Sequence, residues 1–223
     1  MISKYEVKLE DIKAKIGALL HDIIKAHNLS YQAFEDGDNA KYMQAVDTIN
    51  NLSTKGSIID NEIVKTFALF GPEANELRAL VAFLKMTNEI VRIGEGVSKY
   101  ARRMKEHLAS ECNIEPLRKT IAKLHKSSVD ALEKIQECFE NMKECEAEEY
   151  FRRVMVEESI SDDLFSILEK EIMNHIMDER ELSIEYVKVL GTLRKLERVC
   201  DRSVNIASLL VYAKNGGDMN NHL

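Results

Sequence analysis

Apolar side chains recur every three or four positions along six stretches of the chain. This spacing places them on one face of an α-helix and leaves charged residues on the other faces. The six predicted helices cover residues 9–34, 42–67, 77–108, 117–139, 150–177 and 182–213. Each predicted helix has a single apolar stripe and cannot bury it alone, so three such helices must pack together.

Few residues interrupt these helices, since the 223 residues include two prolines and nine glycines. Gly56 is a weak point within the second predicted helix, because glycine lowers helix stability. Gly71-Pro72 closes the second helix and is expected to open the third, with proline in the first turn. Residues 215–217 (NGG) end the last helix, as glycine commonly does. The pattern predicts long helices and an all-α protein.

The two halves of the chain resemble each other. Residues 91–95 (VRIGE) align with residues 197–201 (ERVCD) at an offset of 106 residues, and residues 57–63 resemble residues 166–172. An internal repeat of this kind indicates tandem copies of one structural unit. We therefore predict two tandem three-helix bundles, the first formed by residues 1–112 and the second by residues 113–223.

Composition and charge restrict the class of protein. Hydrophobic residues make up 45% and charged residues 31%, as in a folded globular protein, and the net charge is −7. A nucleic-acid partner is not expected, because phosphate backbones require a surplus of Lys and Arg. The N-terminus has no apolar core of a signal peptide, and no run reaches the length of a membrane span. We expect a soluble, cytoplasmic protein without direct membrane insertion.

The cysteines and one histidine are interpreted as core residues. Cys112, Cys138, Cys145 and Cys200 form no CxxC pair and have no zinc-ligand spacing with histidine. They are predicted to be reduced, packed thiols. His27 lies on the apolar stripe of the first helix and is interpreted as a satisfied core histidine rather than a ligand.

Three oxygen-bearing side chains form a row on the last predicted helix, because Glu197, Asp201 and Asn205 follow one another at intervals of four residues. Each interval turns the row by about 40° around the helix. Like charges four residues apart repel each other, and a bound cation would remove the repulsion. Oxygen ligands favour magnesium, manganese, iron or calcium over zinc. The alternative is a solvated helix face on which Arg194 and Arg198 neutralise the two acids.

Residues 197–207 (ERVCDRSVNIA) resemble the signature of the PhoU family, E-R-[IV]-G-D-x-x-x-N-I-A, with Cys200 in place of its glycine. Residues 71–78 (GPEANELR) resemble the family segment P-x-A-x-D-L-R, with Glu76 in place of aspartate. The resemblance covers nearly the whole chain.

Residues 91–95 resemble the first copy of the same signature. Val91 replaces its leading acid and Lys99 replaces its asparagine. Some family members bind iron or other metals through acid pairs four residues apart. Transferred by position, the resemblance implies metal ligands at Glu197 and Asp201, with Asn205 beside them. In the first half it leaves Glu95 alone, and Lys99 can neutralise it.

Asp162 and Asp163 on the fifth predicted helix are candidates to complete the ligand set, although the sequence does not place them near Asp201.

The resemblance also implies a fold of two three-helix bundles and a regulatory function. PhoU-family proteins act with a phosphate ABC transporter and a phosphate-sensing histidine kinase, and they repress the phosphate-starvation response. The implied partners are the transporter ATPase and the kinase, with a second copy of the chain as a further candidate. An accessory protein of a low-affinity or sodium-coupled phosphate transporter is the first alternative.

A carboxylate-bridged di-iron enzyme is the second alternative. That chemistry requires paired Glu-x-x-His motifs on facing helices. The windows ending at His107, His125 and His175 contain no such pair. No P-loop, dinucleotide fingerprint or nucleophile elbow occurs either. We therefore expect a protein that is not an enzyme.

Overall fold

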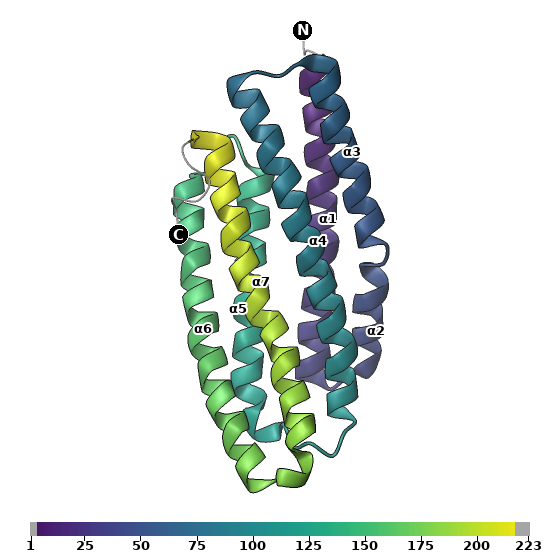
Figure 1. The fold of residues 1–223 in the computed structure, drawn as a ribbon, viewed down its shortest axis with the longest axis vertical. Coiled ribbons are helices and arrows are strands. Elements are labelled where there is room, and N and C mark those ends of the chain that lie inside the picture. Colours follow the sequence, from purple (N-terminus) through teal and green to yellow (C-terminus); the bar gives the residue numbers. More distant parts are fainter. Residues whose placement is uncertain (1–3, 217–223) are drawn as a thin grey trace.

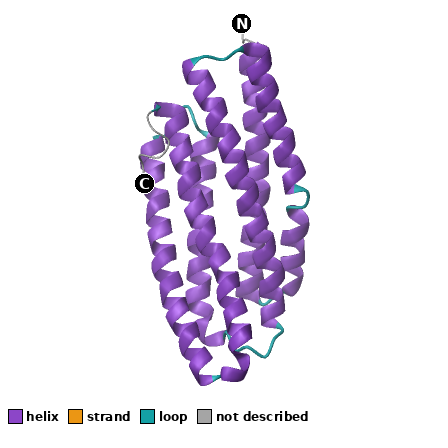
Figure 2. Cartoon of the chain, viewed as in Figure 1, coloured by secondary structure: helices purple, strands orange, loops and turns teal. Residues whose placement is uncertain are grey.

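The computed structural model describes residues 4–216, which are helical and contain no strand (Figure 2). Six long helices are present in this part of the chain, as predicted, together with a short one. The α-helices are α1 (Lys4–Asp36), α2 (Asn39–Thr48), α3 (Leu52–Phe70), α4 (Ala74–Leu108), α5 (Arg118–Glu140), α6 (Ala147–Asp178) and α7 (Ser183–Asn215). Two short 3₁₀ turns, η1 (Glu115–Leu117) and η2 (Arg180–Leu182), precede α5 and α7.

The helices form two bundles that lie side by side. Helices α1 to α4 make up the first bundle, and α5, α6 and α7 make up the second. Helix α1 contacts α5, and α4 contacts α7, so these four helices form a central layer. Helix α6 flanks this layer on one side, and α2 with α3 flanks it on the other (Figure 1). The predicted fold class is confirmed, whereas the division at residues 112 and 113 stays a prediction.

The second helix, predicted as one continuous helix, is divided into α2 and α3. The break lies at residues 49–51, where Asn51 adopts a left-handed backbone conformation with φ of 59°. Asp38 caps the first piece, since its carboxylate accepts a hydrogen bond from the backbone N–H of Ala40. Gly56 does not loosen the helix. It lies inside α3, where an added Cβ would come within 2.7 Å of Val91 on α4.

The predicted helix boundaries at glycine and proline can be compared with the observed ends of α3 and α7 and the start of α4. Gly71 ends α3 in a left-handed conformation, but Pro72 precedes the first residue of α4, Ala74, and so lies outside its first turn. Gly216 follows the end of α7, as predicted, with φ of 80° and ψ of −157°, which lies outside the left-handed helical region that Gly71 adopts. Gly217, the other predicted terminator, lies outside the described residues.

Buried polar contacts join the two bundles. His27 on α1 is fully buried, and its Nε2 lies 2.8 Å from the hydroxyl of Ser128 on α5. His107 on α4 lies 2.9 Å from the hydroxyl of Thr192 on α7. Buried polar groups need such partners, so the two halves share hydrogen bonds as well as apolar contacts. His27 is the satisfied core histidine that the sequence predicts.

The prediction of four reduced cysteines is wrong for two of them. Cys138 near the end of α5 and Cys145 in the following turn form a disulfide, with their Cα atoms 5.4 Å apart. The turn between α5 and α6 folds back on the end of α5 and brings the two thiols together. This proximity depends on the conformation of the turn rather than on a recognisable spacing. Cys112 and Cys200 are free and buried, as predicted.

None of the helices in residues 4–216 combines the length and the hydrophobicity that a membrane span requires.

Candidate metal centre

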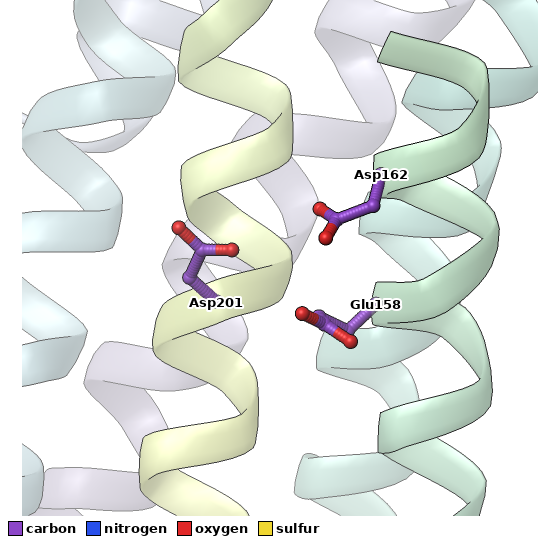
Figure 3. A group of neighbouring side chains, drawn as sticks. All are labelled: Glu158, Asp162 and Asp201. Atoms are coloured by element: carbon purple, nitrogen blue, oxygen red, sulfur yellow. The ribbon is translucent and has the colours of Figure 1, made fainter. Parts of the chain in front are cut away.

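Three carboxylates converge where α6 and α7 lie side by side. Glu158 and Asp162 belong to α6, and Asp201 belongs to α7. One oxygen from each side chain lies within 4.8 Å of the others. Figure 3 shows the three side chains pointing toward one another across the gap between the helices. We call these three residues the acidic cluster.

Local structure explains why the side chains meet. Glu158 and Asp162 are four residues apart, so they occupy adjacent turns on one face of α6. That side of α6 packs against α7, and its neighbours Ser161 and Phe165 are buried there, as is Val204 on α7. The acidic cluster therefore lies at the solvent edge of a packed seam between two helices. The helices fix its position, and no loop contributes to it.

The carboxylates of this seam disfavour one another's ionisation. Burial and the charges of Asp162 and Asp201 raise the pKa of Glu158. Burial and the charge of Asp162 raise the pKa of Asp201, although Arg198 and Arg202 act in the opposite direction. These are the shifts expected where negative charges gather without enough compensating cations.

Glu197 lies beside the acidic cluster, one turn before Asp201 on α7. Burial and the charge of Asp201 raise the pKa of Glu197, and Arg194 partly opposes the effect. Its Oε2 is buried and has no hydrogen-bond partner among the described residues. An unsatisfied buried carboxylate oxygen is costly. It marks a place where a further positive or hydrogen-bonding group would be stabilised.

The two arginines that could neutralise the row do not pair with it. Arg194 forms an ion pair of 3.6 Å with Glu169 on α6, and its guanidinium lies over the ring of Phe165. In the described part of the chain, neither Arg194 nor Arg198 forms an ion pair with Glu197 or Asp201. The interpretation of this row as a salt-bridged helix face is therefore not supported.

The donor set fits a hard cation. Carboxylate oxygens from two helices, with none of the described cysteines or histidines among them, are the ligands that magnesium, manganese, calcium or iron prefer. A divalent cation would offset the repulsion that raises the pKa values of Glu158, Glu197 and Asp201.

The structure separates the predicted site residues. Asp201 belongs to the acidic cluster, and Glu197 is electrostatically coupled to it. Asn205 is exposed, one turn beyond Asp201. Glu95 is exposed on α4 and lines a different groove, between α4 and α7. The four predicted residues thus do not form one site.

Glu158 is a member of the acidic cluster that is not among the residues predicted from the sequence, whereas Asp162 is one of the two predicted candidates on α6. The signal was present, because Glu158 and Asp162 repeat on α6 the four-residue spacing of Glu197 and Asp201 on α7. Asp163 is exposed and not part of the acidic cluster.

The histidines of the di-iron alternative are occupied elsewhere. His107 bonds to Thr192, and His125 packs against His27, with ring centroids 4.5 Å apart, in the core between the bundles. His175 stacks on the ring of Tyr186.

Known proteins resemble this chain in sequence and fold. The PhoU domain matches it twice, over residues 16–104 and 121–210. The phosphate-specific transport system accessory protein PhoU homolog of Pseudomonas aeruginosa is 24% identical over 216 residues, which cover 97% of this chain and 87% of that protein. Its Escherichia coli K12 counterpart, named PhoU, is 24% identical over 223 residues, covering 96% and 87%.

Two crystal structures share the fold. PhoU from Pseudomonas aeruginosa superposes with a TM-score of 0.84 at 22% identity, covering 96% of this chain and all of that one. The phosphate transport system regulatory protein PhoU from Streptococcus pneumoniae gives a TM-score of 0.81 at 18% identity, covering 96% and 98%. The domain match spans most of both halves, so the chain belongs to the PhoU domain family.

Proposed function

We propose that this protein is an accessory regulator of a phosphate transport system, and that it connects the transporter ATPase with a sensor histidine kinase in the cytoplasm. The observation that carries the proposal is the double match to the PhoU domain, together with relatives of nearly the same length that are named phosphate-specific transport accessory proteins. Its expected effect is repression of the phosphate-starvation response when phosphate is plentiful.

The outer face of α6 supports a role in protein binding. Six large apolar side chains on this helix are exposed, and they fall within about 140° of its circumference. They are Met155, Val156, Ile160, Ile167, Met173 and Met177. Exposed apolar side chains gathered on one face are typical of protein-binding surfaces. We propose that this face contacts one of the two partners.

The acidic cluster supports a second element of the function. We propose that Glu158, Asp162 and Asp201 hold a divalent or iron-type cation, with Glu197 as a neighbouring ligand. The cation would tie α6 to α7 and thereby stiffen the helix that presents the apolar face. Asn205 is a further neighbour by resemblance, whereas Glu95 has no second carboxylate beside it in its groove.

Gene deletion and complementation test the regulatory proposal. A phosphate-starvation reporter should be derepressed at high phosphate in the deletion strain, and the wild-type gene should restore repression. A charge in the α6 face, introduced by Ile167→Asp, should abolish complementation, whereas Val7→Asp at an exposed apolar position on α1 should complement fully. Unchanged repression after deletion would favour the accessory protein of a low-affinity or sodium-coupled transporter.

A further inference from the structure

A basic groove lies on the side of α7 that faces α4. It has a volume of about 260 Å³, and five cations line it: Arg92 and Lys99 from α4, and Lys195, Arg198 and Arg202 from α7. Glu95 is the carboxylate among the lining residues that the structure describes. Because the whole chain has a net charge of −7, this concentration of cations is a local feature and does not follow from composition.

The groove lies where equivalent positions of the two repeats face each other. Arg92 and Arg198 are separated by the repeat offset of 106 residues, and so are the apolar lining residues Ile93 and Val199. Each repeat thus contributes the same Arg-aliphatic pair to one groove. Helices α4 and α7 lie side by side in the central layer (Figure 1). Arg92 on α4 and Arg198 on α7 therefore line the groove from opposite helices.

Most of the cations that line this groove form no ion pair within the described residues. Arg202 forms an ion pair with Glu89, with Nη1 and Oε2 2.5 Å apart. Arg92, Lys99, Lys195 and Arg198 form no ion pair with any residue that the structure describes. Burial and the positive charges of Arg198, Arg103 and Lys99 lower the pKa of Lys195. The charge of Arg198 also opposes the rise in the pKa values of Glu197 and Asp201.

We propose that this groove binds a small, elongated anion that carries several phosphoryl groups. Guanidinium and ammonium groups are the side chains that bind phosphate oxygens most strongly. The cations on each helix extend over seven residues, which is about 10 Å along a helix axis, so a single phosphate group cannot reach both ends. No aromatic side chain is among the lining residues, so a nucleobase would lack an aromatic platform on which to stack. These features favour an inorganic phosphate chain over a nucleotide.

Calorimetric titration of the full chain tests the ligand class. The probes are inorganic tripolyphosphate, orthophosphate and a decapeptide of glutamate, all at low ionic strength. The protein is first freed of divalent metals, because tripolyphosphate itself chelates them. We expect tripolyphosphate to bind about tenfold or more tightly than orthophosphate, and salt to weaken its binding. Equal affinities, tighter binding of the peptide, or no binding of tripolyphosphate would overturn the proposal.

Variants locate the binding. Arg92→Gln and Arg198→Gln should each weaken tripolyphosphate binding by about tenfold, the effect of losing one charged hydrogen-bond partner. Gly96→Glu should abolish binding, because an added Cβ meets open space there and the new carboxylate fits in the groove. Gly96→Ala, which adds no charge, should bind as the wild type does.

One further variant distinguishes binding in this groove from diffuse electrostatic attraction. Lys170→Gln removes an exposed cation from α6 and should leave binding within about twofold of wild type. Because the titrations use protein freed of divalent metals, their outcome is independent of the metal proposal. If Lys170→Gln weakened binding as much as Arg198→Gln, attraction would be diffuse and the groove would not be the site. Circular dichroism of every variant checks that the helices are intact.

Discussion

At the scale of single residues, the acidic cluster depends on the four-residue spacing of acids on two facing helices. Glu158 and Asp162 on α6 have the same four-residue spacing as Glu197 and Asp201 on α7. Arg194 pairs with Glu169 and not with either acid of α7. Negative charges therefore meet at the seam with insufficient neutralisation. Burial also disfavours charge in the core, where it lowers the pKa of His27 to about 3.

Asp201→Asn should weaken manganese binding by about tenfold or more, since even outer-shell changes cost that much at metal sites. Titration calorimetry of metal-free protein measures the effect. The matched control is Asp163→Asn, which removes an exposed acid next to Asp162 on the same helix. Acidification should release the cation at a higher pH than for ordinary carboxylates, because the pKa values of Glu158, Glu197 and Asp201 are raised. Equally negligible binding by wild type and Asp201→Asn would contradict the metal proposal.

His27 should make the protein less stable as the pH is lowered below about 6.5. Burial lowers the pKa of His27 in the folded state to about 3, whereas in the unfolded chain it keeps its ordinary value. Between these two pKa values the unfolded state binds one proton more than the folded state. The contribution of neutral His27 to stability is therefore complete above the ordinary pKa and declines as the pH falls below it.

In this pH range His27 contributes about 1.4 kcal/mol per pH unit to the slope of the unfolding free energy against pH. Urea unfolding at pH 5 and 6 gives the change in unfolding free energy between these two pH values. This change should be smaller by about 1.4 kcal/mol in His27→Gln than in the wild type. A His27→Gln variant with the wild-type slope would show that His27 is protonated in the folded state.

At the scale of elements, close helix packing depends on small residues at particular places. Gly94 lies on the buried face of α4, where an added Cβ would approach Leu52 on α3 to 2.5 Å and Ile23 on α1 to 3.0 Å. Gly96, two residues later on the same helix, has open space around it. The two glycines differ in their tertiary neighbours and not in their local sequence.

Gly94→Ala should destabilise the protein by about 1–3 kcal/mol, the usual cost of overpacking. Gly96→Ala should be neutral or should stabilise it by up to about 1 kcal/mol, because alanine favours the helix. Urea denaturation of both variants, followed by circular dichroism, measures the difference. The reverse order of stabilities would show that α3 and α1 can move away from α4 at no cost.

At the scale of the whole molecule, the two repeats do not form independent cores. His27–Ser128 and His107–Thr192 are buried hydrogen bonds that each join one half to the other. The ion pair Arg202–Glu89 also crosses between α7 and α4. A half expressed alone would expose its face of the central layer, with unsatisfied polar groups and a broad apolar surface.

The full chain should therefore unfold in one cooperative transition that coincides when it is followed by circular dichroism and by tyrosine fluorescence. Residues 1–112 alone should self-associate or remain unfolded, as measured by analytical ultracentrifugation. The corresponding test of residues 113–223 should give the same result. A monomeric half with its own cooperative transition would show that the repeats are independent domains.

Much of the fold can be predicted from the sequence, because helix formation and its apolar stripe depend on near neighbours. The stripe through Ile12, Ile16 and Ile23 marks α1, and all three side chains are buried. The repeat of residues 91–95 at 197–201 indicates two equivalent bundles. Asp201 was found in the same way, since its spacing from Glu197 is a property of one helix.

The tertiary structure decided everything that depends on residues distant in sequence. Glu158 became part of a site only because α6 packs against α7, and Glu95 was separated from that site because α4 turns it toward a basic groove. Two local features also escaped the periodic pattern, because it carries no information on turns: the Cys138–Cys145 disulfide and the break before α3 at the left-handed Asn51. Periodicity specifies which face of a helix is apolar, but only packing determines which helix lies opposite its polar edges.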